Sequence, residues 1–223
     1  DYLVNPAVMR YARPDAEQIC LGKHGGGRML TQDEVHEAMI AAARQGKMVV
    51  RLKGGDPAVF GRGAEEAEAL VAAGIGFELV PGVTAALAAG SYAGIPVTHR
   101  DMASAVAFFT GHESDHKDAQ LDIAALASFP GTLVFYMGVT TVRDWTGALS
   151  AGGKSPDTPA AVVRRCSWPD QFTLRTTLGN LADELECRRL RPPVVTIVGD
   201  VVNLAPRLGW FERRPLFGRR IVV

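Results

Sequence analysis

The chain has 223 residues and carries 24 lysines and arginines against 24 aspartates and glutamates, so its formal net charge is zero. This length suits one large domain or two small lobes, and either could bury a hydrophobic core. Hydrophobic residues make up 47% and charged residues 22% of the chain, which excludes a largely disordered protein. Neutrality also removes the usual electrostatic argument for binding to nucleic acid or to a membrane surface.

The charges are unevenly distributed, because residues 188–223 contain eight arginines and only two acidic residues. No run approaches the roughly 18 apolar residues of a membrane-spanning helix. A basic-then-apolar leader is also missing from the sequence, so we expect a cytoplasmic protein. The cysteines at positions 20, 166 and 187 lack the spacing of a metal-binding or redox pair and are expected to be reduced thiols.

Short β-branched runs alternate with helical patterns along the chain, and this alternation predicts an α/β fold with largely parallel sheets. We expect strands at residues 19–21, 48–52, 77–80, 105–109, 132–136, 160–163 and 194–198. We expect helices at residues 32–44, 64–73, 84–92, 123–127, 141–151 and 181–189. Thr31 followed by Glu34 predicts a capping box at the first of these helices. Gly46 and Gly74 lie where glycines commonly end helices.

A boundary between two lobes is expected near residues 94–98. Pro96 resists continuation of the preceding helix, and a new strand pattern follows it. The stretch 112–120 is polar and poor in apolar residues, so we expect it to form a surface loop.

The most informative segment is Lys53-Gly54-Gly55-Asp56-Pro57, which follows a buried strand pattern and precedes a helix. In open α/β sheets, ligands bind beyond the carboxyl ends of the strands, where glycine-rich turns let the backbone approach them. A tight turn that requires positive φ would explain two glycines equally well. The segment is not a phosphate-binding P-loop, because no Gly-Lys-Ser/Thr follows.

Two further strand ends have the same character. The run 77–80 leads into Pro81-Gly82-Val83-Thr84-Ala85-Ala86, where Thr84 can cap a helix of small residues. The third is Phe135-Tyr136-Met137-Gly138. Close helix packing would explain the small residues as well as a ligand does, and a lone methionine is more often core filler. Three strand ends of one kind are better evidence than any one of them, since they can converge on a single cleft.

Two motif matches are rejected. His99-Arg100-Asp101 imitates a kinase catalytic loop, but Val106 stands where that loop needs a metal-binding asparagine. His112 and His116 are four residues apart, as on a metal-chelating helix, yet they fall in the expected loop. We therefore expect no metal site.

The segments 51–57, 60–63, 81–86, 92–101, 110–112 and 134–138 stand in a recognisable order. They include Arg-Leu-Lys-Gly-Gly-Asp-Pro at 51–57 and Thr-His-Arg-Asp at 98–101. Together they resemble the uroporphyrinogen-III C-methyltransferases, a branch of the tetrapyrrole methylases. The resemblance extends from residue 1 to about residue 211.

The resemblance implies a two-lobed tetrapyrrole methylase fold with the active site between the lobes, in a protein that forms a homodimer. The N-terminal lobe would cover residues 1–98, with a largely parallel sheet whose first strands are missing from this sequence. The C-terminal lobe would cover residues 99–209 and contain a mixed sheet. Residues 210–223 resemble a linker that leads into a fused uroporphyrinogen-III synthase domain.

The implied reaction transfers two methyl groups from S-adenosyl-L-methionine to uroporphyrinogen III. It gives precorrin-2 by way of precorrin-1 and leaves S-adenosyl-L-homocysteine, without a metal. The product would feed sirohaem and cobalamin biosynthesis. A sister methylase that acts on a later precorrin stays open as an alternative, as does an inactive, truncated module.

The family's functional residues transfer to this sequence position by position. Its cofactor contacts fall on Gly54, Gly55, Asp56, Val59, Thr84, Ala85, Met137 and Cys166. Its proposed acid–base pair falls on Asp1 and Lys23. The substrate carries eight carboxylates, which call for cations and hydrogen-bond donors. The candidates for those contacts are Arg28, Arg51, Lys53, Arg62 and Arg100.

Three positions depart from the family pattern. Arg28 stands where the family commonly has histidine, and His36 stands where it commonly has asparagine. Cys166 occupies a position that the family gives to a small residue. The family also begins about 25 residues earlier, with a strand, a glycine-rich loop over the cofactor and a second strand. We expect the residues at positions 28 and 36 to alter contacts with the substrate and to leave the class of reaction unchanged.

Overall fold

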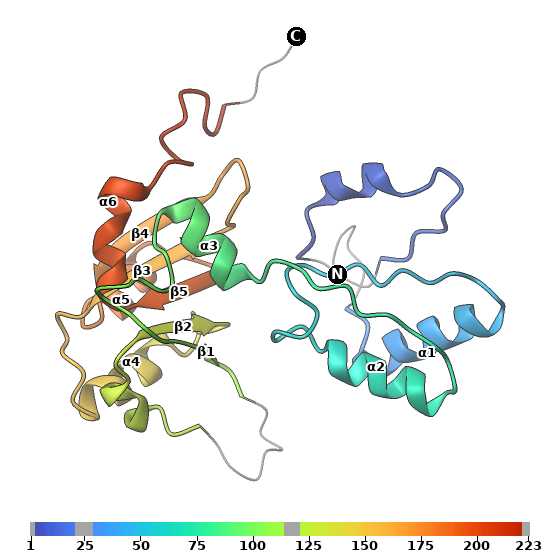
Figure 1. The fold of residues 1–223 in the computed structure, drawn as a ribbon, viewed down its shortest axis with the longest axis horizontal. Coiled ribbons are helices and arrows are strands. Elements are labelled where there is room, and N and C mark those ends of the chain that lie inside the picture. The colour runs from blue at the N-terminus through green and yellow to red at the C-terminus, as the bar shows by residue number, and fades with distance from the viewer. Residues whose placement is uncertain (1–2, 21–28, 114–120, 220–223) are drawn as a thin grey trace. The chain divides into compact units, whose positions relative to one another are not determined.

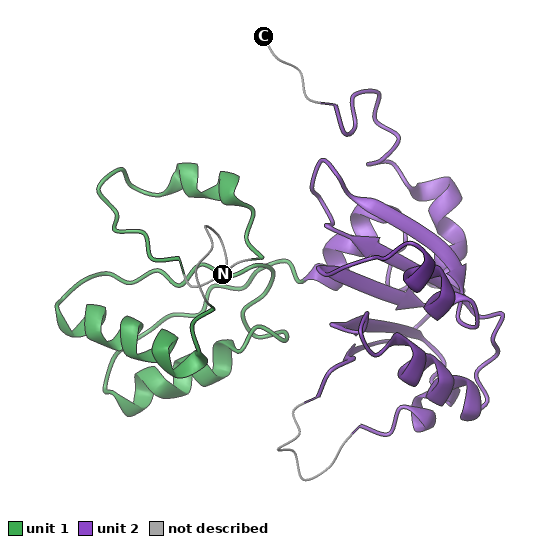
Figure 2. Ribbon diagram, turned by 180° about the vertical axis from the view of Figure 1, so that it is seen from behind, with its two compact units in different colours: residues 1–84 green, residues 85–223 purple. Residues whose placement is uncertain are grey.

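A computed structural model describes residues 3–20, 29–113 and 121–219 (Figure 1). The chain divides into two compact units, an N-terminal unit of residues 1–84 and a C-terminal unit of residues 85–223 (Figure 2). The bounds of the two methylase lobes that the family resemblance implies, residues 1–98 and 99–209, remain predictions. Within the described residues, no helix combines the length and the apolar character that a bilayer crossing requires.

The N-terminal unit contains three described helical segments: η1 (Pro6–Tyr11), α1 (Gln32–Arg44) and α2 (Gly63–Ala72). The predicted capping box is confirmed at α1. The Glu34 backbone N–H donates to Thr31 Oγ1 at 3.3 Å, and the Thr31 N–H donates to the Glu34 carboxylate at 2.7 Å. Gly46 and Gly74 follow α1 and α2 with φ of +75° and +72°, so the predicted helix ends are also confirmed.

The parallel sheet expected in this unit is not present among its described residues. The runs 19–20, 48–52 and 77–80 have no strand assignment. Met48 and Val50 are 92% and 80% exposed, so these apolar side chains are not covered as strand residues in a buried sheet would be. The sequence identifies residues of high β-propensity correctly, but a strand forms only where a second strand satisfies its backbone N–H and C=O groups.

The C-terminal unit is built around a mixed five-stranded sheet, as the resemblance predicted. Its strands are β1 (Val106–Thr110), β2 (Thr132–Tyr136), β3 (Pro159–Arg164), β4 (Phe172–Thr177) and β5 (Val194–Val198). They are arranged in the order β1-β2-β5-β3-β4, in which only β1 and β2 are parallel neighbours. All but β4 fall within one residue of their predicted bounds.

Helices cover both faces of this sheet (Figure 1). They are α3 (Ala85–Ala93), η2 (Ala124–Ser128), α4 (Val142–Ala151), α5 (Leu181–Cys187), η3 (Asp200–Leu204) and α6 (Ala205–Leu208). Leu133 and Phe135 of β2 pack with α4 and α5 in the main core, where the Phe135 and Trp145 rings stack at 4.1 Å. The α3 helix contacts β5 instead. Because helices cover both faces, every residue of β2 is buried, as expected for a strand whose sequence is almost continuously apolar.

The segment after α6 packs back onto the C-terminal unit. Phe211 is buried, and its ring lies 4.7 Å from that of Tyr92. Glu212 accepts hydrogen bonds from Gln171 at 2.9 Å and from Thr173 at 2.5 Å. The residues that open the expected linker are thus anchored to α3 and β4.

Candidate functional site

In the N-terminal unit, the Asp56 carboxylate joins two of the glycine-rich loops that the sequence singled out. One carboxylate oxygen accepts from the Ala58 N–H and the other from the Gly82 N–H, each at 2.9 Å. The hydrogen bond from Gly82, followed by that from Ala58, holds the pKa of Asp56 below its usual value. The segment that carries Gly54 to Val59 is therefore fixed to the segment that leads to Thr84.

Glycine is required where these two loops meet. A Cβ atom added to Gly82 would collide with the carbonyl oxygen of Gly55. Gly55 itself has φ of +81°, a left-handed conformation that other residues adopt with strain. The glycines thus serve a close backbone approach between the loops, beyond the needs of a single tight turn.

In the C-terminal unit, the carboxyl ends of the parallel strands β1 and β2 are tied together. The Gly111 N–H, just after β1, donates to the Tyr136 carbonyl at 2.7 Å. The Thr141 hydroxyl donates to the Gly111 carbonyl at 2.5 Å, and the Trp145 indole N–H donates to the Gly138 carbonyl at 2.9 Å. The segments that follow these two strands are therefore held together, whereas convergence of the three strand ends at 53–57, 81–86 and 135–138 on one cleft stays a prediction.

Sheet register brings Met137 and Cys166 to the same edge. Tyr136 of β2 and Val163 of β3 both pair with Val195 of β5, which lies between them. Because β2 and β3 each run antiparallel to β5, their carboxyl ends lie at one edge of the sheet. Met137 directly follows β2, and Cys166 follows β3 by two residues.

The start of α3 reaches that edge as well. The buried Ala86 N–H donates to the Tyr136 hydroxyl at 2.9 Å. Ala85, the first residue of α3, is thereby placed near the end of β2. Three of the predicted cofactor residues, Ala85, Met137 and Cys166, thus gather at the carboxyl edge of the sheet, where ligands of α/β folds bind.

Strained backbone concentrates at these loops. Six described residues other than glycine have φ between +49° and +68°: Phe60, Arg62, Met137, Arg165, Ser167 and Arg189. Five of the six lie within or directly beside the segments that carry predicted site residues, and Arg189 is the exception. Such conformations cost about 1–3 kcal/mol each and cluster at functional sites. The distribution supports the same loops that the sequence selected.

Two of the predicted substrate-binding cations share a buried carboxylate. Glu66 of α2 is 5% exposed, and its Oε1 lies 2.9 Å from Lys53 Nζ and 3.1 Å from an Arg51 guanidinium nitrogen. The same oxygen accepts from Gln32 of α1 at 3.1 Å, and the Gln32 amide lies 3.0 Å from His36 Nε2. Two positive charges and one negative charge leave the Arg51–Lys53–Glu66 cluster with a net positive charge.

The remaining predicted cations are less constrained. Arg62 is exposed and pairs with Glu65 at 2.8 Å. Arg100 is exposed at the tip of a tight turn closed by hydrogen bonds between the backbones of His99 and Ala103. The predicted residues Asp1, Lys23 and Arg28 lie outside the described residues.

Cys166 has a poorly ionised thiol. Burial, and to a smaller extent the negative charge of Glu212, raises its pKa to about 12. The thiol is therefore protonated at neutral pH and is a weak nucleophile.

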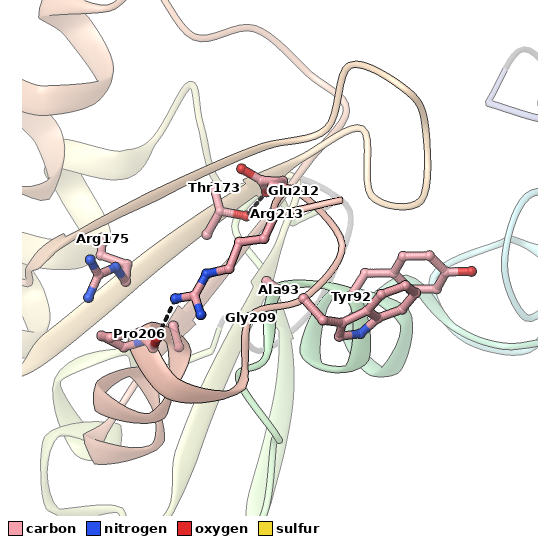
Figure 3. Close-up of a pocket in the computed structure, with 10 residues that line it drawn as sticks. Tyr92, Ala93, Thr173, Arg175, Pro206, Gly209, Glu212 and Arg213 are labelled. Carbon is pink, nitrogen blue, oxygen red and sulfur yellow. Dashed lines mark hydrogen bonds between the residues drawn. The ribbon is translucent and has the colours of Figure 1, made fainter. Parts of the chain in front are cut away.

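A shallow pocket of about 150 Å³ lies elsewhere in the C-terminal unit and contains none of the predicted site residues (Figure 3). It is lined by α3, β4, α6 and residues 209–213. Figure 3 shows the Arg213 guanidinium bonded to the Pro206 carbonyl and Glu212 bonded to Thr173. The Arg213 guanidinium and the Glu212 carboxylate thus already have partners within the protein.

Sequence reasoning missed two residues that hold predicted site residues in place, Glu66 in the N-terminal unit and Tyr136 in the C-terminal unit. A sequence signal for Glu66 exists: it is an acidic residue on the helix that follows a segment with two cations, Arg51 and Lys53. The Tyr136 hydroxyl bonds to a backbone group 50 positions away, which no local pattern indicates.

Known proteins resemble this chain over most of its length. The family description Tetrapyrrole (Corrin/Porphyrin) Methylases matches residues 1–182. An S-adenosyl-L-methionine-dependent uroporphyrinogen III methyltransferase of Methanosarcina barkeri is 49% identical over 94% of this chain and 82% of its own. A siroheme synthase of Edwardsiella ictaluri is 48% identical over 95% of this chain, which spans 45% of that protein.

Solved structures give the same relationship. A uroporphyrin-III C-methyltransferase of Thermus thermophilus, complexed with S-adenosyl homocysteine, aligns with a TM-score of 0.68 and 36% identity over 80% of this chain and 79% of its own. A cobalt precorrin-4 methyltransferase aligns with a TM-score of 0.75 and 28% identity over 91% of this chain and 82% of its own. The chain therefore belongs to the tetrapyrrole (corrin/porphyrin) methylases, and within them to the uroporphyrinogen-III C-methyltransferases.

Proposed function

We propose that this protein catalyses the S-adenosyl-L-methionine-dependent C-methylation of uroporphyrinogen III to precorrin-2, by way of precorrin-1, for sirohaem biosynthesis. The observation that carries the proposal is the 49% identity, across 94% of the chain, with a relative named for this activity. The structural arrangement supports the proposal. Within the N-terminal unit, a hydrogen bond joins the loops of Asp56 and Gly82, and within the C-terminal unit another joins Ala86 to Tyr136.

The residues present fit the methyl donor. The glycine contact between Gly55 and Gly82 leaves no room for a Cβ, so main-chain groups of both loops stay close together. Met137 is half exposed at the sheet edge, with its φ of +53°. The residues that would hold the donor are Gly54, Gly55, Asp56, Val59, Thr84, Ala85, Met137 and Cys166. Bound S-adenosylmethionine would supply an electrophilic methyl group, which a substrate carbon takes up in one displacement.

The protein's contribution to this displacement is chiefly alignment. Rigid loops that hold two reactants in line supply most of the acceleration of such a step. Asp1 and Lys23 are proposed, from the family resemblance, to transfer protons at the macrocycle, which adds a smaller factor. The weakly nucleophilic Cys166 thiol suits a place beside a methyl donor, because a thiolate there would compete for the methyl group.

The cations are proposed to bind the substrate carboxylates. Arg62 and Arg100 are exposed and can form bidentate contacts. The Lys53 side chain is only 9% exposed, so it contributes mainly charge, whereas Arg51 retains 20% exposure. The Arg51 Nε is also buried without a hydrogen-bond partner among the described residues. A substrate carboxylate could compensate the cluster's net positive charge.

A second candidate function is methylation of a later precorrin. The specific observation that favours it is the higher TM-score to the cobalt precorrin-4 methyltransferase, 0.75 against 0.68. Sequence identity favours the early substrate, 36% against 28%. Products from a panel of precorrins, identified by mass, distinguish the two functions. Methylation of a later precorrin alone would replace the proposal.

From the family resemblance, we also propose that the protein is a homodimer and that residues 210–223 are a linker and the start of a uroporphyrinogen-III synthase domain in the same polypeptide. Light scattering of the complete gene product tests the first part. The second part requires that the complete product also cyclises hydroxymethylbilane to uroporphyrinogen III. A monomer, or a product without cyclising activity, would contradict the corresponding part.

A further inference from the structure

Tyr136 connects three segments of the candidate site. It is the last residue of β2 and is 9% exposed. Its hydroxyl oxygen accepts from the Ala86 N–H at 2.9 Å, and its carbonyl accepts from the Gly111 N–H at 2.7 Å. The next residue, Met137, is held in a left-handed conformation. One side chain and its backbone therefore contact the start of α3, the end of β1 and the loop after β2.

The hydrogen bond to Ala86 satisfies a group that would otherwise be costly. The first four backbone N–H groups of an α-helix have no partner within the helix. Ala86 is the second residue of α3 and is fully buried, so water cannot serve as its acceptor. The tyrosine hydroxyl supplies that acceptor from the neighbouring strand, which fixes the first turn of α3 relative to the end of β2.

We propose that Tyr136 is a positioning residue for the methyl donor. Its hydroxyl sets the position of Ala85 relative to Met137, so that both can contact the same donor molecule. The inference rests on the proposed function, in which Ala85 and Met137 are cofactor contacts. It assigns the phenol group a role beyond filling the core, because the aromatic ring alone would satisfy the packing against Phe108.

The test compares two variants that each remove one buried hydroxyl. Y136F keeps the ring and removes the acceptor for Ala86. T146V removes the hydroxyl that donates to the Val142 carbonyl at 2.7 Å within α4, on a helix without predicted site residues. Thr146 is 7% exposed, so the two substitutions have comparable burial. Unfolding by denaturant measures how much stability each variant loses.

Calorimetry then measures the Kd of each variant for S-adenosylhomocysteine, which reports whether the donor's contacts stay in position. We expect Y136F to raise the Kd about 3- to 10-fold, the effect of one lost hydrogen bond, and T146V to leave it within about twofold of the unsubstituted protein. In steady-state assays, the KM for S-adenosylmethionine should rise in Y136F while the KM for the tetrapyrrole stays constant. Hydrogen exchange should accelerate at the first turn of α3 in Y136F alone.

The outcomes separate this inference from the proposed function. Equal S-adenosylhomocysteine affinity in Y136F and the unsubstituted protein would overturn the positioning role, as would equal losses of affinity in Y136F and T146V. If the unsubstituted protein binds S-adenosylhomocysteine but methylates no tetrapyrrole, the proposed reaction fails, and the affinities of the two variants still decide the inference. Absence of binding by the unsubstituted protein would overturn both.

Discussion

The Lys53 ammonium group lies 2.9 Å from the Glu66 carboxylate, and both side chains are more than nine-tenths buried. The pair connects the segment before the Gly54–Gly55 turn to α2. Because Arg51 also bonds to Glu66, one carboxylate holds two of the predicted substrate-binding cations. The relationship makes Glu66 a residue that holds in place two side chains proposed to contact the substrate, and on which stability depends.

Removal of the Glu66 charge should destabilise the protein. E66Q keeps the shape of the side chain but leaves the buried Lys53 and the largely buried Arg51 without a counter-ion. Breaking a buried pair in this way costs about 3–5 kcal/mol. The control E68Q removes an exposed charge from the same helix and should change stability by less than about 0.5 kcal/mol. Denaturant unfolding of both variants measures the difference, and similar stabilities would contradict the assignment.

The same pair should make stability depend on pH. Burial raises the pKa of Glu66, but hydrogen bonds from Lys53 and Gln32 and the charges of Arg51 and Lys53 outweigh burial, so the pKa lies below the usual 4.5. Since the folded-state pKa is depressed, this stabilisation is present above pH 4.5 and is lost as the pH falls through the folded-state value. The stability gap between the unsubstituted protein and E66Q should therefore narrow in acid. A gap that stays constant from neutral pH to below that value would refute this account.

Gly82→Ala should disrupt the contact between the loops of Gly55 and Gly82, which carry predicted cofactor residues. The added methyl group would collide with the Gly55 carbonyl, which is backbone and cannot rotate away. We expect weaker binding of S-adenosylhomocysteine by calorimetry, with a Kd raised roughly tenfold or more for a displaced loop. Gly76→Ala is the matched control, because its Cβ would meet nothing within 4 Å. Unchanged affinity in Gly82→Ala would show that the loop contact is dispensable.

Cys166 should resist alkylation in the folded protein. Its thiol has a pKa of about 12, whereas Cys20 and Cys187 are exposed. The thiolate is the reacting species, so iodoacetamide at neutral pH should modify the two exposed cysteines first. Mass spectrometry before and after unfolding in denaturant measures the order of modification. Equally fast labelling of all three cysteines in the folded state would contradict the burial of this thiol.

Much of the C-terminal unit could be predicted from the sequence, because its elements carry strong local signals. The bounds of β2 and β5, like those of α1 in the N-terminal unit, match their predictions residue for residue. The β4 strand was missed because it lies at the sheet edge and only two of its six residues, Phe172 and Leu174, are apolar, so its sequence resembles a polar loop. The runs 48–52 and 77–80 have the residues of strands, but whether they pair depends on a partner strand, and a local pattern does not contain that information.

In the candidate site too, local features could be predicted from the sequence and long-range contacts could not. Glycine spacing and strand ends identified the loops around Gly55, Gly82 and Met137. The hydrogen bonds that lock those loops, from Gly82 to Asp56 and from Ala86 to Tyr136, join residues 26 and 50 positions apart. Such contacts follow from tertiary packing, so only the structure could reveal them.

The most direct measurement is the mass of the tetrapyrrole that forms when the complete gene product is incubated with S-adenosylmethionine and uroporphyrinogen III. The account predicts a tetrapyrrole that has gained two methyl groups, with a singly methylated species appearing first and two S-adenosylhomocysteine molecules released per product. A parallel reaction with an authentic uroporphyrinogen-III methyltransferase establishes that the conditions are adequate. Failure to form any methylated product under those conditions, or methylation only of a later precorrin, would contradict it.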